Sequence, residues 1–252
     1  MPDIEKDYED RLVAFVDILG WTHATARKSA PELLQTLQPL IARGEFHNET
    51  FRQWAINKHG DRVNPLMLRI QFGFFSDCFV FSVPTSYQGR IYSLVSEIMC
   101  LLLKQGFALR GGIAAGKLFH QDHVVFGPAL IRAYDIEQGE AKFARVLVDP
   151  SALAAAGRNE HDAVIQDHLG NWVIDPFPWI ATTEESQMQD FLRQCFDPGT
   201  TIAVISGKVQ EYRNMPRLRD IWRFQARVCA LSLQKYGPPA ADWVKELQAL
   251  GA

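Results

Sequence analysis

The sequence predicts an α+β fold, with one sheet that carries helices on one of its faces. Three observations favour it: short apolar runs of strand character, amphipathic stretches of helical spacing, and an order in which the two kinds are mixed. Over the first 150 residues the order is β-αα-β-β-α-β-β-α-β. Such an order is typical of a sheet covered by helices.

The expected strands are rich in β-branched and aromatic residues and are bounded by turn residues. They cover 12–16, 66–75, 78–83, 108–115, a hairpin-like pair within 117–126, and 145–148. Apolar residues at helical spacing predict the helices between them. These helices cover 24–37, 40–56, 92–103 and 128–138, and Pro39 separates the first two.

The character of the chain changes after Asp149-Pro150, where helical patterns dominate. One strand is expected at 172–174. Helices are expected at 151–156, 184–194, 200–212, 216–236 and 240–250. This second region is expected to cover the sheet or to build a dimer contact.

Composition excludes several classes of function. A net charge of −3 argues against sequence-independent binding of nucleic acid, which leaves a basic footprint. The start of the chain is acidic and no apolar run is long enough for a membrane span, so a cytoplasmic protein without a membrane partner is expected. The four cysteines lack metal-site spacing and are interpreted as reduced core residues: Cys78, Cys100, Cys195 and Cys229.

Two aspartates adjoin apolar strands. Asp17 closes the run at 12–16, and Asp77 precedes the run at 78–81. Carboxylates are rarely buried without a partner, and oxygen ligands are what Mg²⁺ selects. Gly20 then turns the chain towards a helix start, which favours phosphate. The pair therefore suggests metal-dependent chemistry on a nucleotide, although each aspartate alone could cap a helix or end a hairpin.

Three segments, in this order, resemble the catalytic domain of class III nucleotidyl cyclases. They read F-V-D-I-L-G-W-T at 15–22, F-S-D-C-F at 75–79 and R-G-G-I-A-A-G at 110–116. The resemblance covers roughly residues 10–150 and implies a ferredoxin-like palm. Residues 1–150 are then expected to form the catalytic domain, and residues 151–252 a mainly helical extension that packs on it.

The resemblance also implies roles for individual residues. Asp17 and Asp77, with the carbonyl of Ile18, would bind two Mg²⁺ or Mn²⁺ ions. Such ions activate the ribose 3′-hydroxyl for attack on the α-phosphorus and neutralise the leaving pyrophosphate. Backbone N–H groups from Leu19 and Gly20 onward would hold phosphate oxygens, and Arg110 would bind the triphosphate, unless it is a strand arginine paired with an acid.

The pattern departs from the purine cyclases of this class at the base-reading positions. These positions hold Gln71 and Val124, so the usual polar readers of adenine or guanine are missing. Gln71 can donate and accept hydrogen bonds, so it could read a pyrimidine edge or be an ordinary strand residue. The helix that normally carries Asn and Arg has Ile131 and Asp135 in their place.

Further candidates come with equally plausible structural roles. Arg132 is one residue out of register and could stabilise the transition state or be solvated. Lys142 and Arg145 could contact phosphate or be surface charges. Phe51, or Phe46, could stack on the base or pack in the core.

The altered segment G-P-A-L-I-x-A-Y-x-I-E at 127–137 resembles the pyrimidine cyclases of bacterial Pycsar anti-phage systems. That resemblance implies a homodimer that makes cyclic UMP, or less favourably cyclic CMP, and a separate cyclic-nucleotide-binding effector that reads the product. Two alternatives stay open: a purine cyclase with unusual base readers, and a catalytically dead cyclase fold that regulates a partner.

Overall fold

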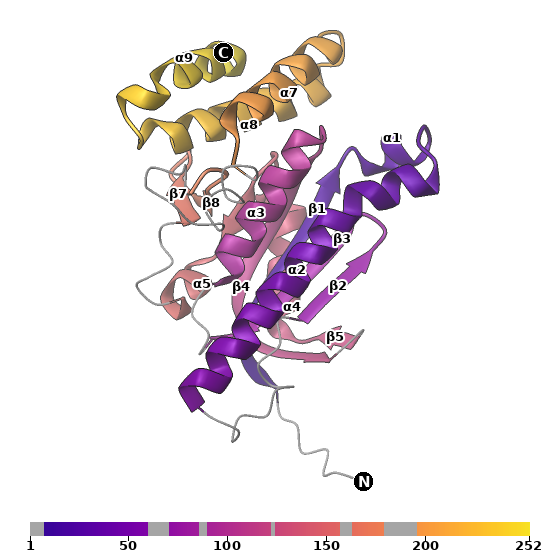
Figure 1. Cartoon of the computed structure of the whole chain (residues 1–252), viewed down its shortest axis with the longest axis vertical. Coiled ribbons are helices and arrows are strands. Elements are labelled where there is room, and N and C mark those ends of the chain that lie inside the picture. The colour runs from indigo at the N-terminus through magenta and orange to yellow at the C-terminus, as the bar shows by residue number, and fades with distance from the viewer. Residues whose placement is uncertain (1–7, 60–70, 86–89, 122–123, 157–162, 179–195) are drawn as a thin grey trace.

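A mixed sheet of eight strands organises the part of the chain that the structure describes (Figure 1). This computed structural model describes residues 8–59, 71–85, 90–121, 124–156, 163–178 and 196–252. The strands are β1 (Glu9–Leu19), β2 (Gln71–Phe75), β3 (Cys78–Pro84), β4 (Ala108–Gln121), β5 (Val124–Phe126), β6 (Val146–Val148), β7 (Val164–Gln166) and β8 (Trp172–Ile174).

The strand order is β2-β3-β1-β4-β6-β8-β7, and β5 pairs with the end of β4. β1 is central and antiparallel to both of its neighbours, β3 and β4. β4 and β6 are parallel, which makes the sheet mixed. Pairing with β4 extends from Glu9 to Leu19, so β1 is longer than its apolar run at 12–16 predicts.

Helices lie over both faces and one end of the sheet. They are α1 (Trp21–Thr25), α2 (Ala30–His59), α3 (Arg90–Lys104), α4 (Pro128–Asp135), α5 (Pro150–Ala155), α7 (Pro198–Glu211), α8 (Pro216–Gln234) and α9 (Ala241–Gly251), with a π-helical turn η3 (Ile136–Glu140) and a short 3₁₀ turn η5 (Pro238–Ala240). In Figure 1, α2 and α3 cross the near face, while α7, α8 and α9 gather at one end.

The alternation of side chains along β1 explains the two faces. Leu12, Ala14 and Val16 belong to the main core with α3. Val13 faces the other way and packs in a second cluster with Ala133 of α4. The α+β prediction is confirmed, but the expectation of helices on one face only is wrong. The small residues of α4 allow it to lie directly on the opposite face.

Gly112 explains why α4 and η3 approach β4 so closely. A Cβ atom there would lie 2.6 Å from the Ala133 carbonyl oxygen and 2.6 Å from the Ile136 Cβ. Such distances are shorter than van der Waals contact, so the position accepts no side chain without a shift. The glycine pair of the R-G-G-I segment is therefore a packing requirement.

The first helical region differs from the prediction. Instead of helices at 24–37 and 40–56, the short α1 is followed by one long α2 that runs through Pro39. One half of a capping box starts α2, because the Ser29 N–H donates to the Glu32 carboxylate, to which the Ser29 hydroxyl also donates. Burial of Leu37 and Leu40 on either side of Pro39 keeps the helix continuous despite the lost backbone hydrogen bond.

Other elements agree more closely. The hairpin of β2 and β3 is confirmed from Gln71 onward, and α3 is confirmed almost residue for residue. The strand at 108–115 and the first arm of the expected hairpin form one strand, β4, because pairing with β1 continues past Gly116. The expected helix at 184–194 and Cys195 lie outside the described residues.

The region after residue 150 contributes both strands and helices. β8 pairs with β6, and β7, which the sequence did not predict, pairs with β8. α7, α8 and α9 confirm the three helices expected near the carboxyl end. In the described ranges, none of the helices combines the length and apolar character needed to cross a membrane.

Replacing Gly112 by alanine tests the close approach of α4. We expect Gly112→Ala to lower the free energy of unfolding by about 1–3 kcal/mol, because overpacking forces the backbone apart. Gly73→Ala in β2 is the matched control, since nothing lies within 4 Å of the added Cβ. Urea denaturation measures both. Equal effects of the two substitutions would contradict the packing explanation.

Candidate active site

Asp17 and Asp77 are far apart in sequence and meet at one end of the sheet. Asp17 lies in β1 opposite Cys78 of β3 and Arg110 of β4. Asp77 belongs to the turn between β2 and β3, and its carbonyl oxygen accepts a hydrogen bond from the Ile18 N–H at 2.8 Å. This bond fixes the turn against β1. One possible ligand atom from each of Asp17, Asp77 and Cys78 lies within 4.8 Å of the others.

The electrostatics of this cluster indicate a place for positive charge. The pKa of Asp17 is raised to about 6 by burial first and by the Asp77 carboxylate second, while Arg110 acts in the opposite direction. A carboxylate held this close to Asp17 disfavours the ionised form of Asp17. A divalent cation between them would remove that cost, and carboxylate oxygens are ligands that Mg²⁺ and Mn²⁺ accept.

Cys78 is a weaker ligand candidate. Burial, with the nearby charges of Asp17 and Asp77, raises the pKa of its thiol to about 12, so it stays protonated at neutral pH. Its half-buried place in the acidic cluster corrects the interpretation of all cysteines as core residues, because β3 begins at Cys78 beside the turn. That interpretation is confirmed for Cys100 and Cys229, which are buried.

Arg110 connects the aspartates to a third acid. Its guanidinium is 3.3 Å from the Asp17 carboxylate and donates to Glu137 at 2.5 Å. The Glu137 side chain is 1% exposed. The structure therefore places Arg110 beside Asp17, and the buried Glu137 holds its guanidinium there.

Sequence reasoning missed Glu137, although a signal was present. Ala129, Ala133, Ile136 and Glu137 follow the i, i+4, i+7, i+8 spacing of one helical face. A carboxylate on a buried face needs a partner. That partner is Arg110.

The loop expected to hold phosphate starts where β1 ends. Ile18 is buried and Leu19 is the last residue of β1. Gly20 has a left-handed backbone (φ 92°) and precedes α1, a conformation that glycine adopts without strain. α1 has only five residues, so the long helix expected from this point is replaced by a single short turn.

The remaining basic candidates have other partners. Arg132 is exposed on α4 and binds Asp149 and Glu140. Among the described contacts, none joins it to Asp17 or Asp77. Arg145 is buried and donates to Asp167. Lys142 is exposed.

The base-reading candidates are only partly described. Gln71 starts β2 opposite Ser82, at the end of the strand away from Asp77, and its side chain is outside the described residues. The same is true of the Phe51 side chain in α2. Val124 in β5 is 55% exposed. Phe46 packs against Arg43, with 4.2 Å between the guanidinium and the ring centre.

No protein-family model matches the chain, and a search of curated proteins gives no match either. Among solved structures it is similar to a bacterial light-regulated adenylyl cyclase, with a TM-score of 0.46, 14% identity and coverage of 77% of this chain and 59% of that one. It is also similar to the non-canonical dimeric guanylyl cyclase domain of the RhoGC fusion protein from the aquatic fungus Blastocladiella emersonii, with a TM-score of 0.41, 15% identity and coverage of 67% of this chain and 95% of that one. A third similar structure is the adenylyl cyclase CyaB from P. aeruginosa, with a TM-score of 0.41, 16% identity and coverage of 72% of this chain and 98% of that one.

The chain thus spans 59% of the length of the light-regulated enzyme. All three likenesses are at low sequence identity.

Replacing Asp17 by asparagine tests the electrostatic cost of the cluster. The folded protein binds the Asp17 proton more tightly than the unfolded chain, because the pKa rises from 3.8 to about 6. This group therefore lowers the free energy of unfolding as pH rises through that window. We expect Asp17→Asn, without divalent ions, to raise the free energy of unfolding at pH 7.5 by about 1–3 kcal/mol.

The gain should shrink at pH 4, where the folded state holds the proton and the unfolded chain is only partly ionised. Urea denaturation in EDTA at the two pH values measures it. Asp10→Asn, at a 62% exposed position of the same strand, is the control. A loss of stability at pH 7.5 on Asp17→Asn would contradict the unfavourable pairing of the aspartates.

Proposed function

We propose that this protein is a metal-dependent nucleotidyl cyclase that converts a pyrimidine nucleoside triphosphate, UTP before CTP, into the 3′,5′-cyclic monophosphate and pyrophosphate. The observation that carries the proposal is the convergence of Asp17 and Asp77 beside Arg110. A nucleoside triphosphate with its metal ions needs acidic ligands for the metal and a positive charge for the phosphates. The two aspartates and Arg110, next to the turn at Gly20, provide both.

Each residue has a defined task in this reaction. The carboxylates of Asp17 and Asp77 would hold two Mg²⁺ or Mn²⁺ ions, with the carbonyl of Ile18 as a further ligand. When bound, these ions acidify the ribose 3′-hydroxyl and neutralise charge on the triphosphate. The 3′-oxygen forms a bond to the α-phosphorus as the bond to pyrophosphate breaks, and the hydroxyl proton passes to solvent.

Arg110 would orient the triphosphate for this attack. Its present partners, Asp17 and Glu137, keep its guanidinium beside the two aspartates. Part of the Arg110 guanidinium would donate to a phosphate oxygen. Glu137, which is buried, would keep the guanidinium oriented during this contact.

The preference for a pyrimidine is supported by what the base-reading positions lack. Val124 has no polar group to bind a purine edge, and Gln71 both donates and accepts. The role in anti-phage defence, with a separate effector for the product, is supported by the resemblance of 127–137. Phage infection of cells that express the protein should raise cyclic UMP. No rise in any cyclic nucleotide would contradict that role.

A homodimer is part of the proposal. Large apolar side chains are exposed on α4 and β5, among them Ile131 (61%), Tyr134 (46%) and Phe126 (47%). Exposed apolar clusters of this kind favour association. Sedimentation velocity should find twice the chain mass of 28.5 kDa, whereas an active monomer would contradict it.

One assay separates the cyclase proposal from its rivals. Purified protein is incubated with each labelled nucleoside triphosphate and Mn²⁺, and the products are identified. We expect cyclic UMP to dominate. A purine cyclase would instead make cyclic AMP or cyclic GMP, and a catalytically dead regulator would make none.

Asp77→Ala should lower turnover at least ~100-fold, because loss of a metal ligand costs at least as much as loss of its outer-shell partner. Asp10→Ala, exposed and remote in β1, should leave turnover unchanged. Equal activity of the two variants would overturn the assignment of Asp77.

A further inference from the structure

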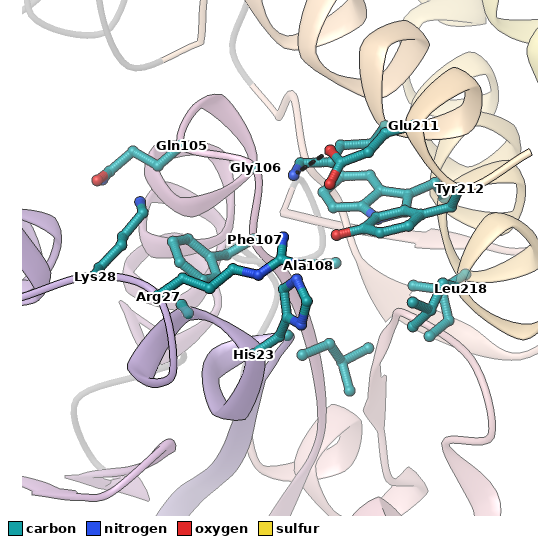
Figure 2. Close-up of a pocket in the computed structure, with 16 residues that line it drawn as sticks. His23, Arg27, Lys28, Gln105, Gly106, Phe107, Ala108, Glu211, Tyr212 and Leu218 are labelled. Atoms are coloured by element: carbon teal, nitrogen blue, oxygen red, sulfur yellow. Dashed lines mark hydrogen bonds and ion pairs between the residues drawn. The ribbon is translucent and has the colours of Figure 1, made fainter. Parts of the chain in front are cut away.

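A cavity lies next to the aspartate site, between the segment that follows β1 and the carboxyl-terminal helices. It has a volume of about 200 Å³ and is shown in Figure 2. Leu19 and Gly20 contribute to its wall, as do residues of α7 and α8. The cavity therefore connects the loop after β1 with the carboxyl-terminal helices, and neither Asp17 nor Asp77 lines it.

The inner wall of the cavity is apolar and aromatic. Phe107 and Trp222 are each 5% exposed, and Tyr212, the residue that follows α7, also lines the cavity. Trp21 packs behind Phe107, with 5.6 Å between the ring centres. These buried rings give the cavity a firm floor on which a flat group can lie.

The rim of the cavity is basic. Arg27, Lys28 and Lys208 line it, together with His23 and a single acid, Glu211. Lys208 is paired with Glu211 at 2.8 Å, so these two charges offset each other. Arg27 and Lys28 remain as excess positive charge, in a chain whose net charge is −3.

In the described ranges, neither of these two cations forms an ion pair. Lys28 makes a cation–π contact with the Phe107 ring at 5.4 Å, and both residues are exposed. Figure 2 shows Arg27 and His23 extending across the cavity towards Glu211 and Tyr212. An arginine fork directed into an aromatic cavity matches a phosphate or carboxylate.

We propose that this cavity binds a small phosphate monoester that carries one flat ring. The phosphate would lie between Arg27 and Lys28, and the ring would pack against Tyr212 and Phe107. The volume is below the ~300–1,000 Å³ of usual ligand sites, which limits the ligand to one ring. The proposal goes beyond the cyclase function and does not depend on it.

The test uses phenyl phosphate as the probe, with inorganic phosphate and phenol as its two halves. Isothermal titration calorimetry is done on the full chain in EDTA, so that no metal ion can recruit phosphate to the aspartates. We expect saturable binding of one phenyl phosphate per chain, about tenfold tighter than inorganic phosphate, and no measurable binding of phenol.

Variants then locate the site. Arg27→Ala/Lys28→Ala should weaken phenyl phosphate at least about tenfold, because two charge-assisted hydrogen bonds are lost. Arg52→Ala/Lys245→Ala removes the same charge from exposed positions elsewhere and should bind as the wild type does. Asp17→Asn should also bind as the wild type does.

Three results would overturn the proposal: no saturable binding, equal binding by both double variants, or equal affinity for phenyl phosphate and inorganic phosphate. Loss of binding in Asp17→Asn would show that the probe occupies the aspartate site instead. The experiment measures binding and not cyclase turnover. Its outcomes therefore test this cavity even if the protein does not catalyse the proposed reaction.

Discussion

The closeness of the Asp17 and Asp77 carboxylates is the constraint on which the account of this protein depends. Like charges at this separation oppose each other, and burial adds to the cost, which the raised pKa of Asp17 records. A fold that keeps such a pair needs favourable interactions in the surrounding backbone that offset the repulsion. Here β1 is paired along both edges, and the Ile18 N–H to Asp77 carbonyl bond closes the turn upon it.

Packing around Gly112 and the ion pairs of Arg110 help to hold the two aspartates in place. Gly112 lets η3 approach the sheet closely enough for Glu137 to reach Arg110. Arg110 in turn contacts Asp17, so the charge at the strand ends is distributed over three acids and one base. Removing Arg110 would leave three acids without a base in a partly buried place.

Local sequence signals predicted much of this fold. The aspartates could be found because each adjoins an apolar strand, and α3 because its apolar residues keep strict helical spacing. The break between α1 and α2 was also readable, since Ser29 and Glu32 have the spacing of a capping box. The break expected at Pro39 does not occur, because burial of Leu37 and Leu40 stabilises the helix by more than the one missing hydrogen bond costs.

Features that depend on tertiary contacts could not be predicted in the same way. β7 has three residues and forms only because β8 lies beside it. The side on which α4 lies depends on which face of β1 is left uncovered. Arg132 and Arg145 are basic residues near the expected motifs, but their partners Asp149 and Asp167 are set by the packing of later segments.

The most direct test is a crystal structure of the protein grown with Mn²⁺ and a non-hydrolysable nucleoside triphosphate. Anomalous scattering locates manganese independently of any assumption about ligands. The account predicts manganese at ordinary coordination distance, roughly 2.0–2.2 Å, from oxygens of both acids, with the phosphates on its far side. Manganese bound elsewhere, or two carboxylates turned away from each other around an ion-free gap, would contradict it.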